Sequence, residues 1–349
     1  MAEFLFEIGL EEVPARMIAG AQAELGSRII EMLRRERLLL GDVKSILVSN
    51  RGLKLGDTEG VKTFSTSRRL AVWVGEVAAR QEDISEELVG PAVKIAYKDG
   101  VPTAAAQAFA KKAGVDVAAL KTVTTAKGEY LAATSVKVGR AAAEVIAEEL
   151  PKELAAIYWA KNMVWRAGRP ERFVRPVRWL LALLGEVVVP VEFGGKTAGR
   201  TTRGHRVLAG DEAIPVGFPD EYEQVLLKAH VMADVEARQQ TIRKALDKAT
   251  RAAGGDSSLR WREDEALVDT VTHLTEWPTV VLGSFEPEYL ALPEEVLVTV
   301  MRDHQKYFAV EEQGTGNREQ GTEGQACSAL SGGAEYGCGC GGRGGDPAW

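Results

Sequence analysis

Pro176 restricts the fold of this chain most, because it lies inside Glu171–Gly185, a stretch with three arginines and a tryptophan that is otherwise largely apolar. Proline lacks an N–H and disfavours the helical conformation in the residue before it. We therefore expect an extended segment through Arg175 that leads into a helix or buried strand starting near Val177. Arg175 and Arg178 lie at this junction, where guanidinium groups can bind phosphates or carboxylates through two hydrogen bonds. The run therefore predicts either a phosphate site or, equally, a structural anchor to carboxylates of a neighbouring domain.

A second basic segment, Arg200–Arg206, follows shortly after the first. Its glycine is expected to let a ligand approach the backbone closely, and a loop of mixed arginine and histidine suits phosphate or sugar. We favour a binding role for Arg203, His205 and Arg206. The net charge of the protein is −7, which argues against a protein that coats nucleic acid non-specifically. It does not exclude local phosphate-binding sites.

Two further groups of polar residues are candidates. Arg68 and Arg69 are predicted either to contact phosphate at the entrance of a strand or to form a solvated charge pair, with equal weight. His304 and Lys306 precede a strand and indicate an edge that faces RNA or a partner, or merely a cap. Large aromatic residues can stack on RNA bases but are more often part of the core, which is the reading we favour for Trp165, Trp179 and Trp277.

The usual catalytic motifs are absent from the sequence. It contains no phosphate loop, dinucleotide fingerprint, His-Glu-x-x-His or Gly-x-Ser-x-Gly, so we assign no catalytic residue. Glu11 and Glu12 are adjacent, would face opposite sides of a strand, and are expected to favour the N-terminus of the next helix through its dipole. The three cysteines, Cys327, Cys338 and Cys340, all lie near the C-terminus. This position excludes a disulfide framework for the rest of the protein, and the spacing of the cysteines predicts no metal site.

Strand and helix patterns mix without regular βαβ alternation, so we predict an α+β fold. Strands are expected at Phe4–Gly9, Leu70–Val77, Val93–Tyr97, Glu129–Val138, Val187–Phe193, Thr279–Leu282 and Lys306–Glu311. Helices are expected at Met17–Glu36, Thr103–Lys112, Arg140–Glu149, Glu263–Thr275 and Pro293–Arg302. Pro151 is expected to interrupt the third of these helices. One long helix is expected from Phe218 to Gly254.

The 349 residues suggest two or three domains. We expect an N-terminal α+β subdomain over residues 1–160 and a second one, with the long helix, over residues 161–312. Residues 42–60 are interpreted as a surface loop or inserted hairpin. Residues 313–349 are rich in glycine and cysteine and are predicted to be disordered. No apolar run reaches membrane length and no secretory signal is visible, so we expect a cytoplasmic protein with no membrane partner.

Six segments, in order, resemble one known family. Together they resemble the N-terminal half of the β-subunit of bacterial heterotetrameric glycyl-tRNA synthetase, from residue 1 to about residue 312. They are Phe6–Pro14, Ser65–Val72, Phe173–Arg178, Thr202–Arg206, Glu276–Pro278 and Asp303–Phe308.

The resemblance implies a subunit of an α2β2 ligase that joins glycine to tRNA(Gly) with ATP. Its α-subunit would carry the adenylate-forming site, so this chain would bind no cofactor and ATP would be used by the whole enzyme. The partners would be the α-subunit, a second β-subunit and tRNA(Gly). The candidate tRNA contacts are Arg203, His205, Arg206, Arg68, Arg69, Arg175, Arg178, His304 and Lys306. The alternative is a scaffold that contacts the α-subunit or other β domains without binding RNA.

The resemblance also implies a fold like the body and tail of archaeal CCA-adding enzymes, and the sequence departs from the family at three places. Ser67 replaces the usual proline before Arg68, and residues 42–60 look like an insertion. The likeness ends near Glu312, after which the tail looks like translation in a shifted reading frame. We therefore expect a truncated chain without the HD-type and anticodon-binding domains, inactive by itself.

Overall fold

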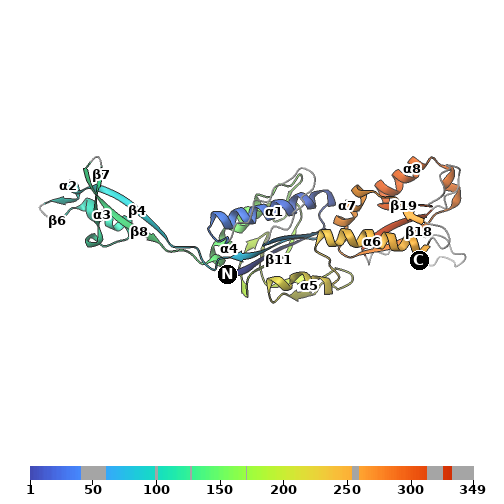
Figure 1. The fold of residues 1–349 in the computed structure, drawn as a ribbon, viewed down its shortest axis with the longest axis horizontal. Coiled ribbons are helices and arrows are strands. Elements are labelled where there is room, and N and C mark those ends of the chain that lie inside the picture. Colours follow the sequence, from blue (N-terminus) through green and yellow to red (C-terminus); the bar gives the residue numbers. More distant parts are fainter. Residues whose placement is uncertain are drawn as a thin grey trace.

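The computed structural model describes residues 1–40, 60–98, 101–125, 128–169, 171–253, 259–312 and 325–331. It confirms a mixed α+β fold, with several antiparallel sheets. Three parts lie along the long axis of the molecule (Figure 1). We call the elements from Ile84 to Lys137 the distal part, those from Val235 onward the C-terminal part, and the others the central part. The insertion expected at residues 42–60 lies almost wholly outside the described residues. Within the described residues, no helix has the length and apolar character needed to cross a membrane.

The central part is built on a five-stranded antiparallel sheet with the order β12-β11-β1-β3-β2. Of the two alternatives expected to start near Val177, a helix or a buried strand, the structure has the strand, β11, which pairs with β1 so that Leu181 lies opposite Glu7. The bounds of the strands are β1 Ala2–Leu10, β2 Val61–Thr66, β3 Arg69–Val77, β11 Val177–Leu184 and β12 Val187–Val188.

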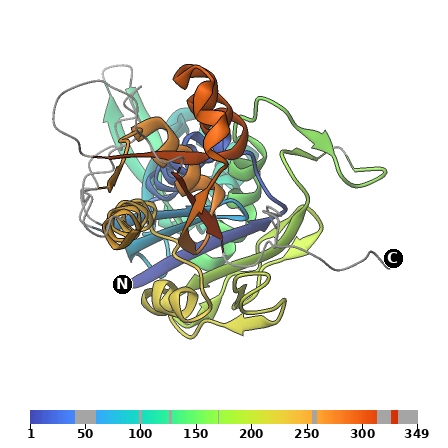
Figure 2. The same ribbon diagram turned by 90° about the vertical axis from the view of Figure 1, so that its right-hand side faces the viewer.

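Both faces of this sheet are covered, which explains why β1 is apolar over nearly its whole length. Helices α1 (Ala15–Arg35) and α4 (Ala142–Ala155) lie on one face, and α5 (Tyr222–Lys228) lies on the other (Figure 2). Because side chains alternate along a strand, Phe4 and Phe6 face the two longer helices. Leu5 faces the opposite core with Tyr222, and Glu7 shares that side of the strand.

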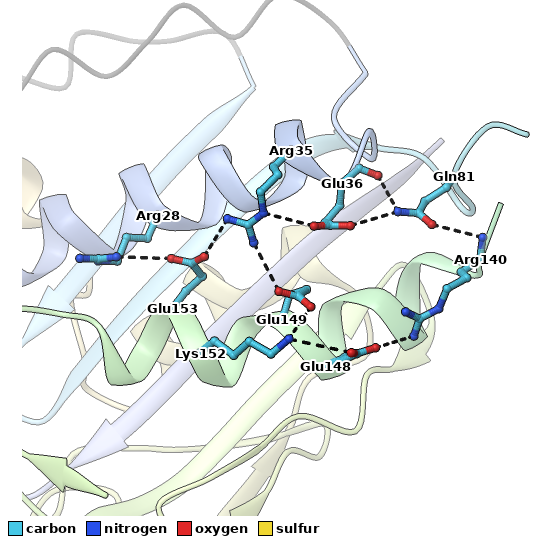
Figure 3. A network of polar contacts seen from close by, with 9 residues as sticks. All are labelled: Arg28, Arg35, Glu36, Gln81, Arg140, Glu148, Glu149, Lys152 and Glu153. Carbon is cyan, nitrogen blue, oxygen red and sulfur yellow. Dashed lines mark hydrogen bonds and ion pairs between the residues drawn. The ribbon is translucent and has the colours of Figure 1, made fainter. Parts of the chain in front are cut away.

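Pro151 does not interrupt α4, so that prediction is wrong. Core residues on both sides of the proline, Leu150 and Leu154, are fully buried. Ion pairs also tie the helix to α1, since Arg35 lies 3.1 Å from Glu153 and 3.5 Å from Glu149 (Figure 3). These tertiary contacts offset the hydrogen bond that proline removes.

The distal part has its own small core around Phe109 and Leu131. The segment expected as a strand at Val93–Tyr97 is instead helix α2 (Val93–Ala96), because Ala96 is buried in that core and Thr103 binds the helix end. The Thr103 hydroxyl donates to the carbonyl of Ile95 at 2.9 Å. The other elements are β4 Ile84–Ala92, β5 Tyr97–Lys98, β6 Val101–Pro102, α3 Ala104–Ala113, β7 Lys121–Thr125 and β8 Gly128–Lys137.

Two chain segments, Ala79–Gln81 and Gly139–Ala142, form a neck between the distal and central parts (Figure 1). The Gln81 N–H donates to the Arg140 carbonyl at 2.9 Å, and the Ala142 N–H donates to the Ala79 carbonyl at 2.9 Å. A Cβ on Gly139 would lie 1.9 Å from the Gln81 carbonyl oxygen. Only glycine therefore lets the two segments approach this closely.

The long helix predicted from Phe218 is wrong, because the chain forms α5 and a separate helix α6 (Val235–Ala253). His230 adopts a positive φ of 56°, and the Val231 N–H donates to the Leu226 carbonyl at 2.9 Å. This is a Schellman-type helix end without the usual glycine. Asp234 then begins α6, its carboxylate accepting from the Ala237 N–H at 2.8 Å.

The strand predicted at Val187–Phe193 is also divided. It forms β12 and a separate strand β13 (Glu192–Phe193), which pairs with β14 (Lys196–Thr197). Pro190 lies between the two strands and has no N–H to donate to a sheet ladder.

The C-terminal part packs α6 and α7 (Glu265–Leu274) on a four-stranded sheet with the order β17-β19-β20-β18. Its strands are β17 Leu259–Trp261, β18 Pro278–Ser284, β19 Tyr307–Glu312 and β20 Gln325–Ser331, and α8 spans Glu294–Thr299. Disorder was expected for the whole tail, but β20 pairs with both β18 and β19. The rest of the tail lies outside the described residues.

The expected boundary near residue 160 falls inside the central part. Strand β11 pairs with β1, and one core contains both Leu150 and Val177. We therefore propose a division into distal, central and C-terminal parts in place of the two predicted subdomains.

Candidate functional site

Five of the six segments that carry the family resemblance meet at one end of the central sheet. Gly9 on β1 pairs with Arg69 on β3 and with Trp179 on β11. A Cβ on Gly9 would lie 2.0 Å from the Trp179 ring, so the indole lies directly against this glycine. Strand β15 (Thr201–Arg203) and Glu276 complete the group. The sixth segment, Asp303–Phe308, lies in the C-terminal part.

The centre of this site is the buried guanidinium of Arg69, which is 0% exposed. It donates to Glu7 Oε1 at 3.2 Å and to Glu276 Oε1 at 3.3 Å. The Thr202 hydroxyl donates to Glu7 Oε1 at 3.0 Å, and the Thr66 hydroxyl donates to Glu276 Oε1 at 2.6 Å. One arginine thus joins β1, β3 and β15 to the connection between α7 and β18.

A second buried arginine, Arg238 on α6, is bound by backbone carbonyls. It donates to the carbonyl of Thr272 at 2.7 Å, to that of Ser65 at 2.9 Å and to that of Met232. Burial lowers the pKa of Arg238 to about 10. This side chain therefore attaches the C-terminal part to the edge of the central sheet at β2.

The two carboxylates around Arg69 have different acidities. Burial raises the pKa of Glu7, although Arg69 opposes the shift. Burial also acts to raise the pKa of Glu276, but Arg69, the Thr66 hydroxyl and Arg68 together outweigh it, so the pKa is lowered. Since all these groups are buried, the network is suited to holding elements together and not to proton transfer with a substrate.

Glu11 joins the two basic segments at the surface. Arg178 lies 3.3 Å and Arg206 lies 3.0 Å from its carboxylate, and Arg206 is also 3.9 Å from Glu12. Arg175 donates to the backbone carbonyl of Glu12 at 2.7 Å. We call Arg175, Arg178 and Arg206 the arginine rim. The two glutamates were expected to favour the helix N-terminus, but their side chains instead bind arginines.

Arg68, Arg203 and His205 are less available than expected. Arg68 is buried, with its guanidinium carbon 5.8 Å from the centre of the Trp179 ring, and burial lowers its pKa. Arg203 lies 3.3 Å from the Asp211 carboxylate. The buried His205 accepts at Nδ1 from the N–H of Leu208 at 3.2 Å, and burial lowers its pKa.

Gly204 serves packing and not ligand approach. A Cβ there would lie 2.7 Å from the Cβ of Ala209 and 2.9 Å from that of Ala229. The expectation that this glycine opens the backbone to a ligand is therefore wrong.

His304 and Lys306 lie apart from the rim: His304 is in the helical segment Val300–Gln305, and Lys306 follows this segment directly before β19. His304 is exposed, and Lys306 donates to the carbonyl of Asp303 at 2.8 Å. Trp179 is buried as expected, and Trp277 lies edge-on to the His230 ring at 5.3 Å. Trp165 is partly exposed and is not a core residue.

Apart from Arg69, the sequence argument gave no role to the residues that form the two buried arginine networks. A signal existed for Glu7, since a charged residue in the middle of an apolar strand needs a partner. Local sequence carried no comparable signal for Arg238, which resembles any other basic residue on an amphipathic helix. The residues missed are Glu7, Thr66, Thr202, Arg238 and Glu276.

Comparison with known proteins supplies a family. The sequence model of a family described as glycyl-tRNA synthetase beta subunit matches residues 4–320. The glycine–tRNA ligase beta subunit of Acidobacterium capsulatum is 63% identical over 312 residues, which are 89% of this chain and 42% of that protein. The corresponding subunit of Myxococcus xanthus is 44% identical over 309 residues, 88% of this chain and 40% of that protein. The chain thus spans about two fifths of these relatives.

Proposed function

This chain belongs to the glycyl-tRNA synthetase beta subunit family, and from that membership we propose that it serves the ATP-dependent attachment of glycine to tRNA(Gly) as a tRNA-binding subunit. The observation that carries the proposal is the 63% identity over 89% of the chain. In this proposal the α-subunit holds the adenylate-forming site, two copies of each subunit assemble in the cytoplasm, and ATP is used by the assembly.

We assign the contact with tRNA phosphates first to the arginine rim. Arg178 and Arg206 have side chains 55% and 48% exposed, and arginine binds phosphate with two hydrogen bonds. Arg69 is fully buried, so it supports the rim from beneath and does not touch RNA itself. His304 and Lys306 remain candidates for a separate contact in the C-terminal part.

The proposal extends to the likeness with the body and tail of archaeal CCA-adding enzymes. Those enzymes are expected to bind the acceptor arm of tRNA by recognising its shape and contacting its phosphates. The elongated arrangement of the three parts supports this mode of binding (Figure 1).

A binding assay with labelled tRNA(Gly), with and without the α-subunit, tests the rim. The double variant Arg178→Ala with Arg206→Ala is expected to weaken binding and to reduce the salt dependence by roughly 0.7–0.9 for each lost phosphate contact. Arg35→Ala with Arg140→Ala is the matched control, since these arginines are also exposed and bound to glutamates. Equal binding and salt dependence in the two double variants would remove the rim from the site.

One observation favours the alternative of a scaffold that does not bind RNA. Arg178 and Arg206 already share the carboxylate of Glu11, as internal anchors would. A pull-down with the α-subunit separates the two functions. Rim variants that lose the α-subunit and retain tRNA binding would support the scaffold.

A further inference from the structure

A hairpin leaves the central part between α4 and β11, and we call its residues 158–172 the arm. Strand β9 (Met163–Val164) pairs with β10 (Arg172–Phe173) at its base. Figure 2 shows the arm, in green, extending away from the body of the molecule. Among the described residues from Ala160 to Arg172, all are exposed except the half-buried Arg166. Trp159 anchors the arm in the central core, and from Ala160 onward the side chains of the arm face solvent.

The charge of the arm is opposite to that of the protein. The arm contains four cations and one carboxylate, Glu171, whereas the whole chain has a net charge of −7. The Glu171 carboxylate forms an ion pair with Arg166 at 3.2 Å. In the part of the chain that the structure describes, no carboxylate lies within ion-pair distance of the other three: Lys161, Arg169 and Arg172. These cations are available to an anionic partner.

The arm also exposes aromatic surface beside these cations. Tyr158 is 76% exposed and Trp165 is 39% exposed. The Trp165 indole N–H donates to the Phe173 carbonyl at 2.9 Å, which holds its ring in place at the base of the arm. Trp165 and Arg175 line the same small hollow, so the arm continues into the arginine rim. Exposed aromatic rings on a cationic segment are an arrangement that binds unpaired bases and their phosphates.

We propose that the arm binds RNA at an unpaired nucleotide segment. Lys161, Arg169 and Arg172 contact phosphates, and Tyr158 and Trp165 stack on exposed bases. A protein partner would use the same aromatic surface, but three cations without carboxylates favour a polyanion. The inference rests on the proposed function, because it takes tRNA as the RNA that reaches the arm.

The test is an anisotropy titration of the full chain with fluorescein-labelled tRNA(Gly) at several salt concentrations. Arg169→Gln with Arg172→Gln is expected to weaken binding and to reduce the salt dependence by about 1.4–1.8, for two lost phosphate contacts. Tyr158→Ala is expected to weaken binding roughly tenfold without changing the salt dependence. The control is Lys111→Gln with Lys112→Gln, two exposed lysines on α3 in the distal part. These exposed positions leave the fold intact, which a thermal melt verifies.

Each other outcome overturns the inference in a distinguishable way. Unchanged binding by the arm variants, with tight binding by the unmodified chain, removes the arm alone. Equal effects of the arm and α3 variants show a diffuse charge effect with no specific arm. Retained tRNA binding with lost α-subunit capture makes the arm a protein contact. No tRNA binding by the unmodified chain, alone or with the α-subunit, overturns the proposed function and the arm with it.

Discussion

Arg69 shows how one residue sets the arrangement of this molecule. Its guanidinium lies between Glu7 and Glu276, which come from positions 62 and 207 residues away. Removing one member of a buried ion pair leaves an uncompensated charge, which costs far more than the pair itself contributes. The pairs of the rim are exposed to solvent, so each contributes little to stability.

Arg69→Met is therefore expected to destabilise the fold by about 3–5 kcal/mol, because Glu7 and Glu276 lose their shared partner. Arg178→Met, which breaks an exposed pair, is expected to cost about 1 kcal/mol or less. Urea denaturation measures both. Similar losses of unfolding free energy would show that the buried network does not hold the parts together.

The acidity of Glu276 predicts a pH dependence. Its pKa in the folded state is lowered from 4.5, so its contribution to stability is complete above about pH 4.5 and is lost as the pH falls through the folded-state pKa. Glu276→Gln lacks this titration. The stability difference between the unmodified chain and the variant should shrink below pH 4.5, as followed by urea denaturation across pH. A difference that stays constant or grows would contradict the lowered pKa.

At the scale of elements, several boundaries depend on contacts that local patterns do not reveal. The end of α5 has His230 in the left-handed conformation, where glycine is the usual signal. The course of α4 through Pro151 depends on packing against α1. The neck depends on such a contact too, because the backbone of Gly139 packs directly against the backbone of Gln81.

Gly139→Ala should open the neck, since its Cβ would lie 1.9 Å from a backbone oxygen and the chain must shift. The N–H groups of Gln81 and Ala142 should then exchange hydrogen at least tenfold faster, as measured by hydrogen–deuterium exchange. Gly20→Ala is the control, because a Cβ there meets nothing within 4 Å. This change, in the exposed face of α1, should instead stabilise the protein by about 0.5–1 kcal/mol. Unchanged exchange in the neck would contradict the close approach.

At the scale of the whole molecule, separate cores imply separable parts. The distal core around Phe109 shares no residue with the central core around Phe6. The neck is the connection between them (Figure 1). A part with its own core and a narrow connection can be removed without exposing the core of its neighbour.

Replacing residues 83–138 with a short glycine–serine linker should therefore leave the central and C-terminal parts folded. The melting temperature should change by only a few degrees, because the central core and the Arg69 network stay intact. Calorimetry with circular dichroism measures this. Loss of a cooperative transition would show that the distal part is required for folding.

Local sequence was sufficient for the family, for the α+β class and for the start of an element near Val177, but it left open whether that element is a helix or a strand. Each of these depends on short segments whose residue types and order can be read directly along the chain. It was not sufficient for the roles of the arginines. The ion pair of Arg206 with Glu11 joins residues 195 positions apart, and the burial of Arg69 depends on how the central and C-terminal parts pack. An arginine beside a carboxylate partner and one facing solvent look alike in sequence, because burial and pairing arise only when distant segments meet.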